Sequence, residues 1–131
     1  MLGIHIPARF WSVCYDGDRI PDAFNDLSGG ANCQRFAYAL LAVNGVRLPP
    51  FRSSELWADE IHTVRVQAPE QLDLLLFHDG PDAFGAHVAV CTGGGNAIHL
   101  SKDVGSPQIL ALDDFAHSPK YRYYIGAKRA L

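Results

Sequence analysis

The sequence has few charges, and it lacks any apolar run long enough to cross a membrane. Charged residues make up 19% of the 131 residues, and the net charge is −3 with the histidines neutral. A chain without an excess of positive charge offers no attractive surface to a nucleic-acid backbone or an anionic membrane. Since a spanning helix needs about 20 consecutive apolar residues, the sequence also predicts no membrane span. Nucleic acids and membranes are therefore excluded as expected partners.

The N-terminus lacks the cationic start, apolar stretch and small-residue cleavage site of a secretion signal. We therefore expect a cytoplasmic protein, or one exported by a non-classical, phage or secretion-machine route. Repeats, low-complexity runs and linkers are also missing. With apolar residues at 48%, the composition predicts a single domain over residues 1–131, in which residues 1–31 form an irregular N-terminal segment.

Cysteine is scarce, and its three copies cannot all pair within the chain. Cys14, Cys33 and Cys91 show neither a CxxC spacing nor a zinc-knuckle pattern. Free thiols in a reducing compartment are the simpler interpretation. Cys91 alternates within an apolar stretch and is interpreted as a packed residue, and Cys14 is also interpreted as structural. Cys33 is the cysteine that needs a further explanation.

Helix signals gather in the first half of the chain and strand signals in the second. Asn32 is a good helix N-cap and Asn44-Gly45 can close a helix, so the sequence predicts a helix over Cys33–Val43. Shorter helices are expected near residues 21–27 and over residues 53–59. Strands are expected over residues 73–78, 87–92, 97–101, 108–112 and 121–125. This order predicts an α+β fold with an antiparallel meander of about five strands.

Cys33 stands where a small-residue loop meets the predicted helix, in SGGANCQRFAYALLAVNG over residues 28–45. A helix N-terminus favours negative charge and lowers the pKa of a cysteine thiol, and the thiolate is the reactive form. The small residues before it would let a substrate chain approach closely. The alternative is a buried structural thiol, and the position of Cys33 alone does not decide between the two.

His87 opens one predicted strand and His99 lies in the next, with a glycine-rich turn between them. A tight turn would bring the two imidazoles opposite or diagonal to each other across the ladder. One imidazole could then act as a base toward a thiol while the other orients it, as in a catalytic triad. The alternatives are two histidines satisfied in a core, or a zinc site made by Cys33, His87 and His99. No HExxH or CxxC motif supports zinc, so neither a metal nor a cofactor is expected.

The other four histidines show no partner pattern and are interpreted as surface or incidental residues. They are His5, His62, His78 and His117.

Four stretches, in their order along the chain, resemble the NlpC-type papain-like cysteine peptidases of bacterial cell-wall metabolism. The stretches are NCQRF, LDLLLF, HVAV and GGGNAIH. In the family they correspond to a cysteine motif that starts the central helix, a strand, a strand opening with histidine, and a glycine turn before a strand with a second polar residue. The resemblance covers about residues 28–125. It implies a papain-like fold, in which the central helix bears the nucleophile and packs on the antiparallel sheet.

The resemblance also implies roles and an activity. Cys33 would be the nucleophile, His87 the general base and His99 the orienting third member, and the backbone N–H of Cys33 would be one oxyanion donor. Tyr15 is the candidate for a tyrosine that often lines the site in the family. The implied reaction is hydrolysis of an amide in a peptidoglycan stem peptide, as a γ-D-glutamyl–diaminopimelate endopeptidase that requires no metal.

The chain departs from the family pattern beside the cysteine. Asn32 replaces the usual Asp, and Gln34-Arg35 replaces Ser-Gly, where the Asp and Ser of the family help hold the free amino end of the substrate. Asn32, Gln34 and Arg35 are therefore expected to shape substrate binding here. Two alternatives stay open. One is an acyltransferase or amidase with another substrate. The other is a non-catalytic assembly or effector module with the same fold, whose partner would be an immunity or inhibitor protein.

Overall fold

The computed structural model describes residues 3–131, and its central helix is α1 (Cys33–Val43). Asn32 caps this helix, because its side-chain oxygen accepts the backbone N–H of Arg35 at 2.8 Å. Gly45 follows the helix with a φ of +86°, a left-handed conformation that suits glycine. The predicted helix is thus confirmed at both ends.

Six antiparallel strands form one sheet in the order β1-β6-β2-β3-β4-β5. The strands are β1 (Thr63–Val66), β2 (Leu74–His78), β3 (His87–Gly93), β4 (Asn96–Leu100), β5 (Pro107–Ala111) and β6 (Tyr123–Ala130). The predicted meander is confirmed for β2 to β5. Strand β6 instead returns to the other side of β2 and pairs with both β2 and β1. The expectation of five strands is corrected to six, because β1 is a short, largely exposed edge strand with little apolar pattern.

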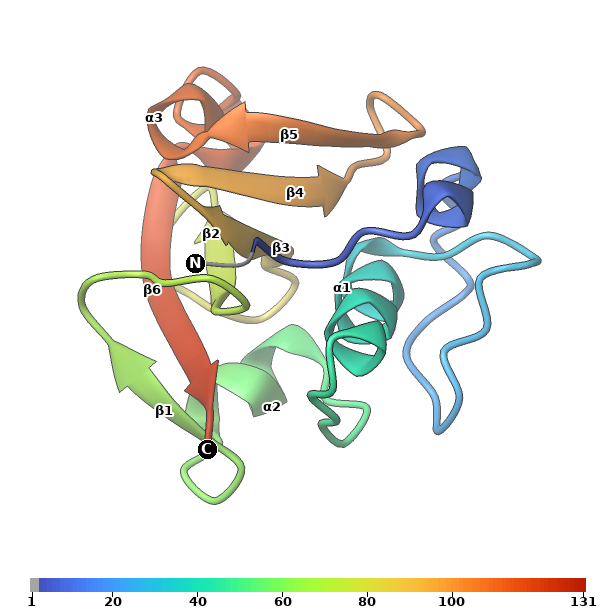
Figure 1. The fold of residues 1–131 in the computed structure, drawn as a ribbon. Helices are drawn as coiled ribbons and strands as arrows, with labels where there is room; N and C mark the ends of the chain where they lie inside the picture. The colour runs from blue at the N-terminus through green and yellow to red at the C-terminus, as the bar shows by residue number, and fades with distance from the viewer. Residues whose placement is uncertain (1–2) are drawn as a thin grey trace.

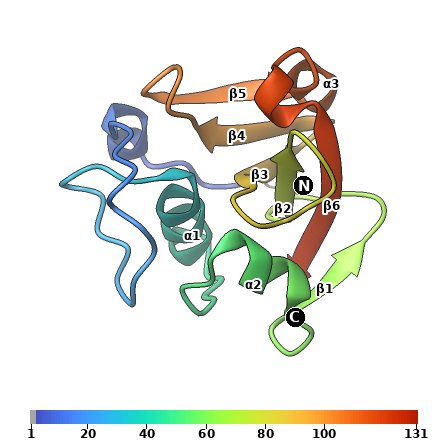
Figure 2. The same ribbon diagram turned by 180° about the vertical axis from the view of Figure 1, so that it is seen from behind.

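Both faces of the sheet are covered, since alternate residues of a strand point to opposite faces. The face toward α1 carries the larger core, which includes Phe36 and Leu40 of the helix. The opposite face carries a smaller core with Phe77, Cys91 and Phe115, the last from α3 (Leu112–Phe115). Figure 1 and Figure 2 show α1 beside β3 and β4, with α3 following the end of β5. Cys91 is 1% exposed, as its alternation predicts.

Residues 3–31 are irregular apart from one 3-10 helix, η1 (Ala8–Ser12). The expected helix near residues 21–27 is wrong. Asp22 instead accepts the backbone N–H groups of Phe24 and Asn25 at 2.9 and 2.7 Å. An aspartate that bonds nearby N–H groups in this way competes with the helical hydrogen bonds and favours a turn.

The second predicted helix is confirmed as α2 (Ser53–Ala58), and a short 3-10 helix, η2 (Pro119–Tyr121), precedes β6. Ser53 is buried, and its Oγ accepts the backbone N–H of Ala86 at 3.1 Å. This bond fixes the residue that comes directly before His87. All three cysteines are free thiols. Within residues 3–131 no helix has the length and apolar character needed to span a bilayer.

Candidate active site

Cys33 is the first residue of α1 and lines a hollow of about 270 Å³ together with His87, Tyr15 and Tyr121. Burial raises the pKa of its thiol, although the backbone N–H groups of Val88 and Gln34 donate toward the sulfur and act in the opposite sense. The expected lowering of the pKa by the helix terminus is therefore overturned, because desolvation of a thiolate outweighs the favourable N–H groups. A thiol whose pKa is raised in this way is protonated at neutral pH.

His87 and His99 meet across the hairpin of β3 and β4. Nε2 of His87 lies 2.7 Å from Nδ1 of His99, a hydrogen bond between two buried rings. Val90 pairs with Ile98 in the ladder of β3 and β4, and continuing this register puts His99 diagonal to His87. A diagonal position is one of the two that the glycine turn predicts. Because Nε2 of His87 is hydrogen-bonded to His99, Nδ1 is the ring nitrogen of His87 that remains available to accept a proton from a thiol.

Both rings are neutral at neutral pH. Burial, and then the neighbouring His99, lower the pKa of His87 well below 6.5. Burial lowers the pKa of His99 to about 4, while the side chain of Gln108 acts in the opposite sense. The site therefore holds an uncharged thiol and two uncharged imidazoles at neutral pH.

Two aromatic rings hold the histidines in orientation. The ring of Tyr121 stacks on His87 with centroids 4.4 Å apart, and the ring of Phe115 meets His99 edge-on at 4.8 Å. Burial raises the pKa of Tyr121 to about 12, so its hydroxyl stays protonated. Nothing in the sequence marks these two aromatics as part of the site, because they come from α3 and η2, after the last predicted motif.

Tyr15 and His78 also line the hollow, the first a candidate site residue from the sequence and the second not. Tyr15 lines the hollow, and burial and then the nearby Cys33 raise its pKa. His78, interpreted from the sequence as a surface or incidental residue, also lines the hollow, with Nδ1 3.0 Å from a carboxylate oxygen of Asp79. The sequence offers one signal that His78 belongs to the hollow: it ends the buried strand β2, which pairs with the strand that begins at His87.

Lysines complete the rim. Lys102 and Lys120 both line the hollow, and Nζ of Lys120 donates to Asp103 at 2.9 Å.

The three residues that depart from the family pattern do not line this hollow. The side-chain oxygen of Asn32 is used as the helix cap. Arg35 is buried and points to the N-terminal segment, where it pairs with Asp22 at 2.9 Å. Gln34 is 4% exposed, and its Oε1 has no hydrogen-bond partner among the described residues. Their expected contact with a substrate is therefore not supported by where the fold places them.

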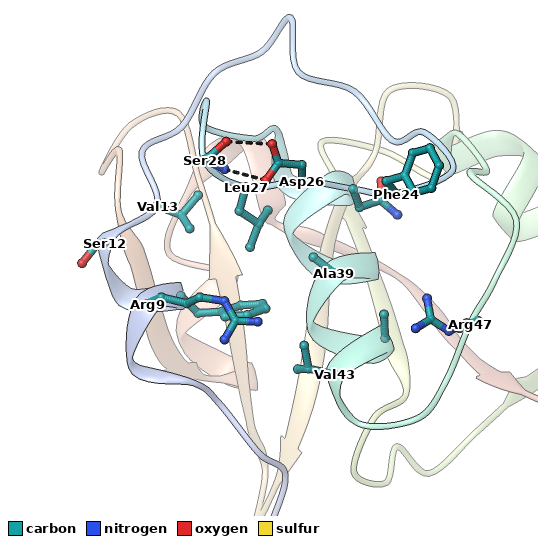
Figure 3. A pocket seen from close by; sticks show the side chains of 13 residues that line it. Arg9, Ser12, Val13, Phe24, Asp26, Leu27, Ser28, Ala39, Val43 and Arg47 are labelled. Carbon is teal, nitrogen blue, oxygen red and sulfur yellow. Dashed lines mark hydrogen bonds between the residues drawn. The ribbon is translucent and has the colours of Figure 1, made fainter.

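A larger hollow of about 710 Å³ lies on the other side of α1, between η1 and the turn over residues 24–28 (Figure 3). Its lining includes Ala39 and Val43 of the helix and no cysteine or histidine. The carboxylate of Asp26 there accepts both the backbone N–H and the hydroxyl of Ser28. A cysteine and a histidine therefore line the smaller hollow together, and neither residue type lines the larger one.

Within residues 3–131 no three histidine, cysteine, aspartate or glutamate side chains gather in an arrangement that could hold a metal ion. The zinc arrangement of Cys33, His87 and His99 is accordingly not formed in this structure.

The raised pKa of Cys33 predicts a pH dependence for alkylation by iodoacetamide. We expect Cys33 to react slowly at neutral pH and faster as the pH rises past 9, because only the thiolate attacks. Exposed Cys14 provides the internal comparison, with each site followed by peptide mass spectrometry. A Cys33 rate that exceeds that of Cys14 and stays flat between about pH 5 and 8 would instead indicate a thiolate–imidazolium pair.

The lowered pKa of His99 predicts a pH dependence of stability. Below the unfolded-state value of about 6.5 the unfolded chain takes up a proton that the folded ring, with a pKa of about 4, does not. Proton uptake by the unfolded chain alone favours unfolding. The stability that depends on a neutral His99 is therefore present above pH 6.5 and is lost as the pH falls toward 4. Between pH 7 and 5 the free energy of unfolding of His99→Asn should fall by about 2 kcal/mol less than that of the wild type.

Urea unfolding at the two pH values gives this difference, and His117→Asn, at an exposed site, is the matched control. Equal losses in wild type and His99→Asn would show that His99 is not held neutral by the fold.

No protein-family model matches the chain, and no curated protein matches it. Solved structures do match. An NlpC/P60 family protein from Bacillus cereus ATCC 10987 matches with a TM-score of 0.59 and 25% identity, over 78% of this chain and 32% of that one. The NlpC/p60 domain of the peptidoglycan hydrolase SagA matches with a TM-score of 0.51 and 24% identity, over 73% of this chain and 80% of that one.

The peptidoglycan hydrolase RipB from Mycobacterium tuberculosis matches with a TM-score of 0.51 and 22% identity, over 79% of this chain and 53% of that one. The chain thus spans about a third of the length of the Bacillus protein and about half of that of RipB.

Proposed function

Because this chain has an NlpC/P60-type fold, we propose that it is a cysteine hydrolase that cleaves an amide bond through a Cys33–His87–His99 triad. The observation that carries the proposal is the 2.7 Å hydrogen bond between His87 and His99, next to a cysteine that begins the central helix and shares a hollow with His87. A nucleophile, a base and an orienting partner are the three parts that such catalysis requires.

The neutral resting state defines the order of proton transfers. Nδ1 of His87 takes the thiol proton of Cys33 as the sulfur attacks the substrate carbonyl carbon. The oxyanion that forms is stabilised by the backbone N–H of Cys33 at the helix N-terminus. His87 then gives the proton to the leaving amine, and the C–N bond breaks to leave a thioester. Water, deprotonated by His87, attacks the thioester and releases the acid and the thiol.

His99 acts through its bond to Nε2 of His87. It holds the ring of His87 in place and stabilises the imidazolium that forms during attack. The protonated hydroxyl of Tyr15 faces the same hollow and can donate a hydrogen bond to the bound substrate. The ring of Tyr121, stacked on His87, lines the same hollow and helps to keep the imidazole in place.

For the substrate we propose a peptidoglycan stem peptide, cut between γ-D-glutamate and diaminopimelate. The support is that SagA and RipB, which share the fold, are peptidoglycan hydrolases. The test is mass spectrometry of purified muropeptides after incubation with the protein. We expect two fragments that together contain one added water, with a new amine on the diaminopimelate side. Muropeptides that stay intact, while another amide or ester is consumed, would contradict this substrate.

Acyl transfer or deamidation on another substrate is a second candidate. The observation in its favour is that Asn32 is used as the helix cap and Gln34 is buried, and neither lines the hollow, so the usual means of holding a substrate amine is missing. Incubation with an added amine acceptor distinguishes the two. A transferase gives an acyl–acceptor product and a deamidase releases ammonia, whereas the proposed endopeptidase gives a free acid and a peptide amine.

A further inference from the structure

Gln108 of β5 lies directly opposite His99 of β4 in the sheet. Residues opposite each other in an antiparallel pair point to the same face, about 5 Å apart at Cβ, so the side chain of Gln108 reaches the ring of His99. Nδ1 of His99 is bonded to His87, which leaves Nε2 for Gln108. That Nε2 is buried and has no hydrogen-bond partner among residues 3–131, while the side chain of Gln108 acts on the ring to raise its pKa.

The single hydrogen bond between the two histidines allows two proton arrangements. In the first, His87 donates from Nε2 to Nδ1 of His99, so Nδ1 of His87 carries a free lone pair and can act as a base. In the second, His99 donates from Nδ1, so the one proton of neutral His87 sits on Nδ1 and blocks it. The heavy-atom positions are the same in both, and the bond length does not choose between them.

The first arrangement puts a proton on Nε2 of His99, inside the protein. A buried N–H needs an acceptor, and leaving it without one costs about 1–3 kcal/mol. The side-chain amide of Gln108 contains such an acceptor, its oxygen Oε1. The amide of Gln108 also carries an NH2 donor, which would serve the second arrangement. The side chain of Gln108 acts to raise the pKa of His99, however, as an accepting oxygen does and a donating NH2 does not.

We propose that Gln108 is a positioning residue that accepts the Nε2 proton of His99 through Oε1 and thereby keeps Nδ1 of His87 free to act as the base. The chain of bonds runs from Oε1 of Gln108 to Nε2–H of His99, then from Nδ1 of His99 to Nε2–H of His87. Its catalytic consequence rests on the proposed function, but the arrangement of protons does not.

An uncharged acceptor suits this site. His99 is 2% exposed and packs edge-on against Phe115, so a carboxylate at residue 108 would favour a protonated His99. A protonated His99 carries hydrogen on both nitrogens and would donate to His87, which is the blocking arrangement. The amide oxygen of Gln108 satisfies Nε2–H without adding charge.

The test is long-range ¹H–¹⁵N NMR of the ¹⁵N-labelled protein at neutral pH, which reads the tautomer of each neutral imidazole. Signals are assigned with His87→Gln and His99→Asn. In the wild type we expect the proton on Nε2 of both rings. Gln108→Met, similar in size but without the acceptor, should shift His87 toward the Nδ1–H form. Ile109→Met is the matched control, because its side chain points to the other face of β5 and is 44% exposed.

On a muropeptide that the wild type cleaves, Gln108→Met should lower kcat by about 10–100-fold with little change in KM, the usual cost of losing an outer hydrogen-bond partner. A wild-type His99 without a proton on Nε2 would overturn the proposal, and so would a Gln108→Met protein with unchanged tautomers. If the tautomers are as expected but the wild type cleaves no amide, the proposed function fails and the role of Gln108 in placing the proton stands.

Discussion

Replacing Cys33 by alanine is expected to lower kcat/KM for amide hydrolysis by at least about a thousandfold. Without the sulfur no thioester forms, and the remaining groups can only bind the substrate and polarise its carbonyl. The change is small in volume and lies at the first residue of α1, where the cap of Asn32 is kept, so the protein should fold. Initial rates of muropeptide cleavage measure the effect.

Two further variants make the result specific to the triad. Cys14→Ala removes an exposed thiol outside the hollow and should leave kcat/KM unchanged. His87→Ala added to Cys33→Ala should cost almost nothing more, because the two act as one unit. A Cys33→Ala protein that keeps more than about a tenth of the wild-type kcat/KM would rule out the nucleophile role.

Arg35→Met is expected to lower the free energy of unfolding by about 3 kcal/mol. The buried guanidinium donates to the backbone oxygen of Asp26 at 2.7 Å and to that of Ile20 at 2.9 Å, and it pairs with Asp22. Most of the loss comes from the two backbone acceptors, since Asp22 is half exposed and its ion pair is screened by water. Urea unfolding monitored by circular dichroism measures it.

The matched control is Arg47→Met, in the exposed loop after α1, which should change stability by less than about 0.5 kcal/mol. The Arg35→Met protein also distinguishes a structural role of Arg35 from a role in substrate binding. If it holds the N-terminal segment in place, KM measured well below the unfolding temperature stays near the wild-type value. An Arg35→Met protein that is as stable as the wild type but has a raised KM would show instead that Arg35 takes part in substrate binding.

The elements best predicted from the sequence are those whose signals are local. The ends of α1 depend on Asn32 and Gly45, which act within one turn of the helix. The hairpin of β3 and β4 depends on a glycine turn between two apolar stretches, and the meeting of His87 with His99 follows from it. Strand β1 was missed because the strand that pairs with it, β6, lies at the other end of the chain.

The environment of the site could not be predicted in the same way. Tyr121 and Gln108 reach the histidines only through sheet pairing and the return of the chain after α3. In the sequence Arg35 stands two residues after Cys33. Along a helix such residues do not face the same way, and the fold turns Arg35 toward the N-terminal segment.

The sequence by itself determined the helix that begins at Cys33, the strands that carry His87 and His99, and hence the pieces of a candidate triad, because caps, turns and strand alternation act over a few residues. The tertiary structure alone decided the charge state of that site. Burial raises the pKa of the thiol and lowers those of both imidazoles, against what a helix N-terminus favours. Desolvation depends on every group that surrounds an atom, and those groups come together only when the whole chain has folded.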